Sequence, residues 1–276
     1  MVKSPKRKRL QPPPKCIFCG KGKLTKEHIW PNWLRDYVLH DVTRYATGTG
    51  SIFWTHEEET AKQHPRDSRN RGLGVVCGHC NGGWIRLLQT NAKSILIPLI
   101  EGGHCNLDEH SQGTLAAWSC MAIMVGEFFS SYAVAIPKSD RSWLWQRQTP
   151  PKNWKIWIGT YRRVHWKGQW AHSTRPILAN DCAEMASHSV APPNTQETTF
   201  VIGQLYIHAF SCPFSNLVSS SNVSGTGGTK MAQLWPPRAP VIKWPLALMT
   251  DRDANEIAGC IFSGIDRAIK RPDPRS

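Results

Sequence analysis

Two CxxC pairs constrain this 276-residue chain more than any other feature of its sequence. The first pair is Cys16 and Cys19, and the second pair is Cys77 and Cys80. Each CxxC turn can aim two sulfurs at one point, so the two turns together supply the four thiolates of a tetrahedral zinc site. Such a site is coordinatively closed and serves structure. We therefore predict one structural zinc that pins the long segment between the pairs.

A second group of polar residues lies beside these pairs, and a structural zinc does not explain it. Glu27 and His28 follow the first pair, and Asn81 directly follows Cys80. An acidic residue next to a histidine, beside a metal-pinned turn that ends in asparagine, favours a second, open metal site. The alternative interpretation is that Glu27 and His28 are a salt-bridging pair on the surface of a zinc ribbon.

The order of these motifs is similar to that of a known family. CxxC, then Glu-His-Ile-x-Pro, then CxxC-Asn at the start of a helix resembles the HNH endonucleases, the ββα-metal group, over about residues 13–103. The run Cys-Asn-Gly-Gly-Trp at 80–84, with the apolar helix after it, also resembles a phage and bacterial HNH subgroup. The fold that this resemblance implies is α+β, with an N-terminal ββα-metal zinc-knuckle domain.

The resemblance also implies a role for each matching residue. His28 would be the general base that activates water, because a neutral imidazole has a pKa close to working pH. Glu27 and Asn81 would hold a catalytic divalent ion, Mg²⁺ or Mn²⁺, which prefers oxygen ligands. Asn70 would orient His28. Gln89 departs from the pattern, since relatives in this subgroup often carry Glu at that point.

The charge of the chain favours a polyanionic partner. The formal net charge is +14, and such an excess of Lys and Arg attracts nucleic acid. The charge is uneven and gathers at the N-terminus and around the first CxxC pair. The alternative is a surface charged for solubility. The residues that we expect to contact phosphates are Lys6, Arg7, Lys8, Arg9, Lys23, Lys26, Arg69 and Arg71.

Apolar segments and the remaining cysteines give further limits. The longest apolar run, near 95–100, is too short to span a bilayer, and no apolar core follows the basic N-terminus. We therefore expect a cytoplasmic location and no membrane partner; the sequence does not indicate an oligomeric state. The five other cysteines have no CxxC spacing and are predicted to be free, mostly buried thiols. They are Cys105, Cys120, Cys182, Cys212 and Cys260.

Composition and periodicity divide the chain into three parts. Residues 1–14 are predicted to be a disordered basic arm, with a merely solvated tail as the alternative. Residues 15–104 are predicted to form the HNH domain with its structural zinc. Residues 105–276 are predicted to form an α+β domain with an antiparallel sheet, which positions the substrate and contains no further metal-ligand spacing.

Local patterns predict the elements within these parts. We expect strands over 25–29 and 75–76, a core-facing helix from 81 to about 100 and a buried helix over 115–129. A Pro- and Trp-rich connector is expected over 137–153, paired strands over 155–161 and 164–171, and one strand over 200–210. A mobile Ser/Gly-rich loop is expected over 215–230, and Thr250-Asp251 is expected to cap a last helix over 254–269.

These features together favour a metal-dependent endonuclease that hydrolyses phosphodiester bonds, with double-stranded DNA as its expected partner. One alternative belongs to another class: a zinc-ribbon protein that binds nucleic acid without cleaving it. A second alternative is a nuclease that acts on RNA, because a basic arm and aromatic side chains suit single strands equally well.

Overall fold

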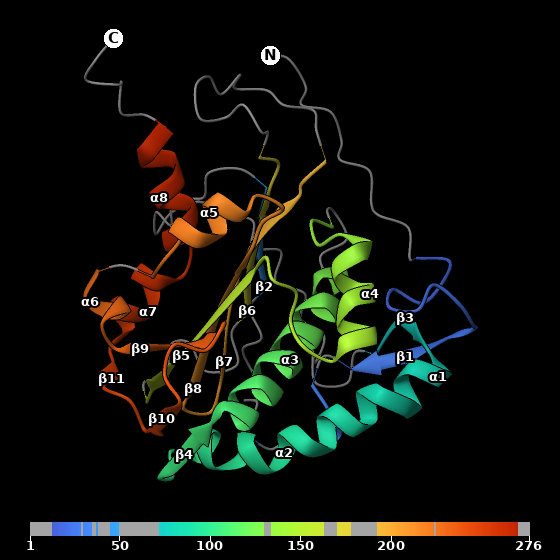
Figure 1. Cartoon of the computed structure of the whole chain (residues 1–276), viewed down its shortest axis with the longest axis horizontal. Coiled ribbons are helices and arrows are strands. Elements are labelled where there is room, and N and C mark those ends of the chain that lie inside the picture. The colour runs from blue at the N-terminus through green and yellow to red at the C-terminus, as the bar shows by residue number, and fades with distance from the viewer. Residues whose placement is uncertain are drawn as a thin grey trace.

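A seven-stranded mixed sheet divides the molecule into layers, with helices packed against both of its faces (Figure 1). The computed structural model describes residues 13–28, 30–34, 37, 45–49, 72–129, 134–162, 170–177, 192–223 and 225–269. The strands of the sheet are β2 (Tyr45–Thr49), β5 (Trp154–Tyr161), β6 (Trp170–Arg175), β7 (Thr195–Ile202), β8 (Leu205–Ser211), β9 (Met231–Trp235) and β11 (Leu248–Met249). The predicted α+β class is confirmed.

The order of the strands is β11-β5-β8-β7-β6-β2, and β9 also pairs with β5. The pairs β5–β8, β7–β8 and β6–β7 are antiparallel. The pairs β2–β6 and β11–β5 are parallel. The predicted antiparallel sheet is therefore present at the centre, and parallel pairs extend it to a mixed sheet.

Both faces of this sheet are covered, because its central strands β5, β7 and β8 are buried at every position. All residues of β5 are buried, and successive side chains of a strand point to opposite faces. Ile156 and Ile158 join a core formed with the helices α2 and α3, whereas Trp157 joins a second core formed with α7 and α8. In Figure 1, α2, α3 and α4 lie on one side of the sheet and α5 to α8 on the other.

The helix predicted from 81 to about 100 is confirmed. It consists of α1 (Gly78–Cys80), a π-helical turn η3 (Asn81–Ile85) and α2 (Arg86–Glu101). Leu88 and Ala92 are buried as predicted, but the core-facing prediction is wrong for Leu87, which is 55% exposed.

The second predicted helix is also confirmed. It is α3 (Glu109–Gly126), followed by a 3-10 turn η4 (Glu127–Phe129). The Asp108 side chain caps α3 by accepting a hydrogen bond from Ser111 N at 2.8 Å. Every residue of α3 from Leu115 onward is buried, which makes it the central helix of the larger core.

Three predictions about the second half of the chain are wrong. The expected connector over 137–153 contains the helix α4 (Lys138–Arg147). The expected loop over 215–230 contains the short helices α5 (Ser215–Ser220) and α6 (Gly225–Gly228). The expected single strand over 200–210 is the junction of β7 and β8, which a turn at Gly203 and Gln204 divides.

Two further predictions concern a pair of strands and the last helix. β5 pairs with β8, β9 and β11, and β6 pairs with β7. Of the expected partner strand over 164–171, only 170 and 171, at the start of β6, lie within the described residues. Thr250 caps the last helical region as predicted, in a capping box with Asp253. That region is two helices, α7 (Asp251–Ile257) and α8 (Cys260–Ile269), because Gly259 adopts a φ of 88° between them.

The N-terminal part packs directly onto the sheet. Its elements are β1 (Leu24–His28), a 3-10 turn η1 (Asn32–Leu34) and β3 (Gly72–Cys77). The centroid of the Trp30 ring lies 5.8 Å from that of Trp170 in β6 and 5.5 Å from that of Phe200 in β7. A further two-stranded sheet pairs β4 (Cys105–Asp108) with β10 (Val241–Trp244). None of the described helices is long and apolar enough to cross a membrane.

Candidate metal centre and active site

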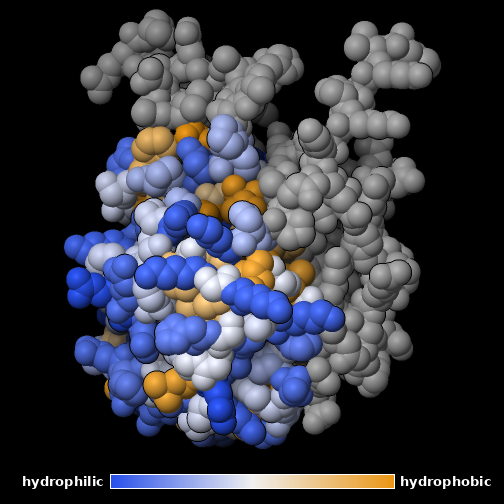
Figure 2. Space-filling view, turned by 90° about the vertical axis from the view of Figure 1, so that its right-hand side faces the viewer, coloured by the Kyte–Doolittle hydropathy of each residue, from blue (hydrophilic) through white to orange (hydrophobic). Residues whose placement is uncertain are grey.

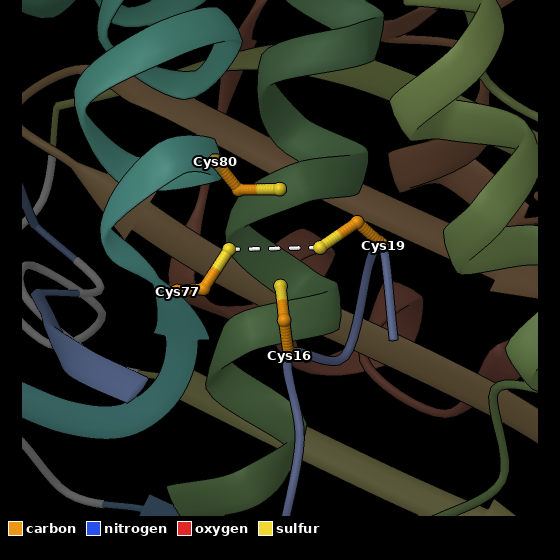
Figure 3. A group of neighbouring side chains, drawn as sticks. All are labelled: Cys16, Cys19, Cys77 and Cys80. Carbon is orange, nitrogen blue, oxygen red and sulfur yellow. Dashed lines mark hydrogen bonds between the residues drawn. The ribbon is translucent and has the colours of Figure 1, made fainter. Parts of the chain in front are cut away.

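The four cysteines of the two CxxC pairs converge on one point (Figure 3). Their sulfur atoms all lie within 4.8 Å of one another, and Cys19 Sγ and Cys77 Sγ are 3.5 Å apart. Ligands at about 2.3 Å from a tetrahedral zinc ion are roughly 3.8 Å apart, so these separations fit one ion. The cluster Cys16, Cys19, Cys77 and Cys80 could therefore hold a metal such as zinc.

Local structure explains why the two pairs meet. The first pair lies on the turn before β1, Cys77 ends β3 and Cys80 ends α1. Ile17 N donates to Val75 O at 3.0 Å and ties this turn to β3. Gly22 has a φ of 77°, and a Cβ at that position would lie 2.9 Å from Cys77 Cβ. Glycine is therefore required where the chain passes the metal centre.

The metal centre requires thiolates, and burial raises the pKa of two of its thiols, Cys19 and Cys80. Burial raises the pKa of the Cys80 thiol well above its usual range. Without metal this sulfur is protonated at neutral pH, so metal binding must release its proton. We therefore expect metal to bind the cluster more weakly as the pH falls.

The strand β1 carries Glu27 and His28 beside this centre. It pairs antiparallel with β3, from Leu24 opposite Cys77 to His28 opposite Gly72, and the helical turns begin directly after β3. The strand predicted over 25–29 is thus confirmed over 24–28. Adjacent residues of a strand point to opposite faces: Glu27 is 4% exposed and faces α2, whereas His28 is only partly buried.

The carboxyl group of Glu27 lies in an unusual environment for an acidic side chain. Gln89 of α2 donates a hydrogen bond from Nε2 to Glu27 Oε1 at 3.0 Å. Burial raises the pKa of Glu27 to about 7, although the bond from Gln89 acts in the opposite direction. A nearby cation would favour the ionised carboxylate, so this position suits an ion ligand.

Asn81 reaches the same strand from the first residue of the π-helical turn. Its Nδ2 donates to Thr25 Oγ1 and to Lys26 O, both at 3.3 Å. The amide therefore lies against β1 immediately before Glu27, and its Oδ1 is a candidate oxygen ligand. The helical segment is kinked two residues later at Gly83, whose φ of −96° and ψ of −112° are not helical.

The structure describes only some of the other residues predicted from the sequence. Lys23 and Lys26 are exposed on and beside β1, where they are accessible to a phosphate backbone. Figure 2 views the side of the molecule that carries α1, β1 and β3, and its described surface is mostly hydrophilic. Asn70, Lys6, Arg7, Lys8, Arg9, Arg69, Arg71 and Cys182 lie outside the described residues.

The structure contains a second cluster of potential metal ligands, which was not predicted from the sequence. Glu197, His208 and Cys260 bring one ligand atom each within 4.8 Å of one another. They come from β7, β8 and α8, so no spacing along the chain could reveal them. The one local signal, a histidine within an apolar strand, is typical of a core or sheet-face histidine, and His208 is fully buried.

Comparison with known proteins gives no family for this chain. No family model matches it, and no significant match occurs among the curated proteins or the solved structures. An assignment of function must therefore depend on the residues and their geometry.

Proposed function

We propose that this protein is a metal-dependent endonuclease of the HNH type that hydrolyses phosphodiester bonds in DNA. The observation that carries the proposal is the pair of hydrogen bonds from Asn81 to β1, at the two residues immediately before Glu27 and His28. Asn81 thus contacts the strand that carries Glu27 and His28, and the same helical segment supplies Gln89, the hydrogen-bond partner of Glu27. The four-cysteine cluster at the base of that hairpin would hold the arrangement in place.

Each residue has a defined part in the proposed reaction. His28 accepts a proton from the attacking water, which requires its neutral form. Glu27 and Asn81 supply oxygen atoms to Mg²⁺ or Mn²⁺. When bound, that ion stabilises the charge that develops on the scissile phosphate and its leaving oxygen. Lys23 and Lys26 contact neighbouring phosphates and hold the DNA backbone in register.

One contact favours the alternative of a zinc-ribbon protein that binds nucleic acid without cleaving it. Gln89 already donates to Glu27 Oε1. Since burial raises the pKa of Glu27 to about 7, this carboxyl group takes up a proton as the pH falls below 7, and its protonated form paired with the Gln89 amide needs no ion. A protein with this pair could keep the scaffold and the basic surface and yet have no catalytic ion.

Plasmid cleavage by the purified chain in EDTA, Mg²⁺ or Mn²⁺ tests the proposal, with His28→Ala beside the unaltered protein. We expect supercoiled DNA to become nicked or linear only with the divalent ion. His28→Ala should lower the rate by about 100-fold or more, the range typical of a general base. The zinc content and melting temperature should stay unchanged.

His104→Ala is the matched control, because His104 is exposed and lies beyond the end of α2. Full activity of His28→Ala would remove His28 from the mechanism. Retention of DNA on a gel without cleavage in any metal would favour the binding protein instead. Parallel assays with single-stranded RNA would separate the RNA-directed alternative.

A further inference from the structure

The second cluster lies far from the hairpin, between the sheet and the start of α8. Glu197 is on β7, His208 is on the neighbouring strand β8, and Cys260 is the first residue of α8. One ligand atom of each lies within 4.8 Å of the others. All three are nearly inaccessible, with exposures of 3%, 0% and 8%. This burial excludes a nucleophilic role for Cys260, because a substrate could not reach the sulfur.

His208 points an unsatisfied nitrogen into this cluster. Its Nδ1 bonds to Thr199 Oγ1 at 2.8 Å. Its Nε2 is buried and makes no hydrogen bond to any of the described residues. A buried polar atom without a partner costs about 1–3 kcal/mol. A metal-bound histidine commonly uses its second nitrogen for an orienting hydrogen bond, and Thr199 supplies such a contact.

Glu197 joins the cluster to the start of α8. Its Oε1 accepts a hydrogen bond from Ile261 N at 3.0 Å, and its Oε2 accepts one from Phe262 N at 2.9 Å. A carboxylate oxygen has a second lone pair, so Oε1 can bind an ion as well. Arg175, which lies over the Phe262 ring, is the nearby cation. A divalent ion with one carboxylate and one thiolate is neutral, which limits its repulsion from Arg175.

The separation of the two sheet residues matches that of two ligands of one ion. Glu197 Oε1 and His208 Nε2 are 3.4 Å apart, which is longer than a usual hydrogen bond. Oxygen and nitrogen ligands at about 2.0–2.1 Å from a tetrahedral zinc ion are roughly 3.3–3.4 Å apart. Carboxylate, imidazole and thiolate are all ligands that zinc accepts.

We propose that Glu197, His208 and Cys260 form a second zinc site, which fastens α8 to the central strands of the sheet. The proposal is independent of nuclease activity, since none of the three residues belongs to the hairpin or its helix. The chain would then hold two zinc ions of different ligand sets, one with four thiolates and one with a single thiolate.

The test is a cobalt titration of the full chain after removal of bound metal, followed through the charge-transfer absorption of cobalt–thiolate bonds. We expect this absorption to stop rising at two equivalents per chain. Mass-spectrometric metal analysis of the protein as purified should likewise find two equivalents of zinc. An end point at one equivalent in the unaltered chain, unchanged in Cys260→Ala, would overturn the proposal.

Substitutions assign the second equivalent to this cluster. Cys260→Ala should lower the zinc content from two equivalents to one. Cys212→Ala is the matched control, because Cys212 is a buried cysteine of the same core and lies outside the cluster; it should keep both. His28→Ala should also keep both. Two equivalents in folded Cys260→Ala would contradict the proposal, and loss of DNA cleavage would have no bearing on it.

Discussion

Two buried glutamates, Glu27 and Glu197, have the same altered acidity in different surroundings. Burial raises the pKa of each to about 7. Glu27 lies on a two-stranded hairpin, where one side-chain amide donates to it. Glu197 lies in the middle of the seven-stranded sheet, where two backbone N–H groups of α8 donate to its two oxygens.

The difference shows that a raised pKa alone does not identify a functional carboxyl group. The oxygens of Glu197 hold the first turn of a helix, so its removal must disturb the fold. Within the described part of the chain, Glu27 accepts one side-chain hydrogen bond, from Gln89, so its removal should affect chemistry more than folding. Four predictions test this contrast.

The largest effect concerns cleavage. Glu27→Gln should lower metal-dependent DNA cleavage by about 100-fold or more, because a neutral amide holds a divalent ion far more weakly than a carboxylate. The measurement is the initial rate of plasmid nicking at saturating Mn²⁺. Glu101→Gln, at an exposed glutamate on the last turn of α2, should cleave normally. Equal rates for both variants would remove Glu27 from the site.

The second effect concerns stability. Glu197→Ala should lower the free energy of unfolding by about 3 kcal/mol, since it leaves two buried N–H groups without an acceptor. Glu27→Ala should lower it by about 1 kcal/mol, the value of one ordinary hydrogen bond. Urea denaturation of both variants measures the difference. A larger decrease in the free energy of unfolding for Glu27→Ala than for Glu197→Ala would contradict this comparison.

The third effect is a dependence of stability on pH. A carboxyl group with a folded pKa of about 7 binds its proton more tightly in the folded than in the unfolded chain, where the pKa is about 4.3. This tighter proton binding stabilises the folded chain fully below about pH 4, and the stabilisation is lost as the pH rises through 7. In the metal-free chain the loss should be on the order of 1–3 kcal/mol for each glutamate.

Urea midpoints at about pH 5, 6 and 7.5 measure this loss. Glu27→Gln should remove the contribution of Glu27 to this loss and leave that of Glu197, because the amide does not titrate. Saturating Mn²⁺ should restore part of the stability at the highest pH in the unaltered chain and none in Glu27→Gln. Identical profiles for the two proteins would show that Glu27 titrates normally.

The smallest effect concerns Gln89. Gln89→Glu places a second carboxylate against Glu27 and should tighten Mn²⁺ binding by about tenfold, or 1.4 kcal/mol. Asn91→Asp adds the same charge to an exposed position of the same helix and should change the affinity little. Calorimetric titration gives both values. A similar gain in both variants would mean that only the overall charge matters.

The sequence was most informative where structure depends on neighbours along the chain. The CxxC turns predict the four-cysteine cluster because their ligands are paired locally. The helical spacing of apolar residues after Asn81 predicts the helix α2. The capping box at Thr250 requires only Asp253, three residues further on.

Features that depend on distant partners could not be predicted in this way. The helix α4 is held by tertiary contacts: Trp154 Nε1 donates to Asp140 Oδ2 at 2.9 Å, and Arg141 forms a buried ion pair with Glu127. The turn at Gly203 breaks a run of residues that is apolar on both sides, so periodicity does not reveal it. The contact between Glu27 and Gln89 likewise joins residues that are remote in the sequence.

The distance along the chain between Cys19 and Cys77, 58 residues, has a consequence for how this protein can change. An ion that holds both cysteines fixes the two ends of the intervening segment. Doubling the length of a closed loop costs only about 0.6 kcal/mol. Upstream of Arg69, the interval between β2 and β3 can therefore gain or lose residues at little cost in loop-closure free energy. It is the natural place to graft a foreign recognition segment.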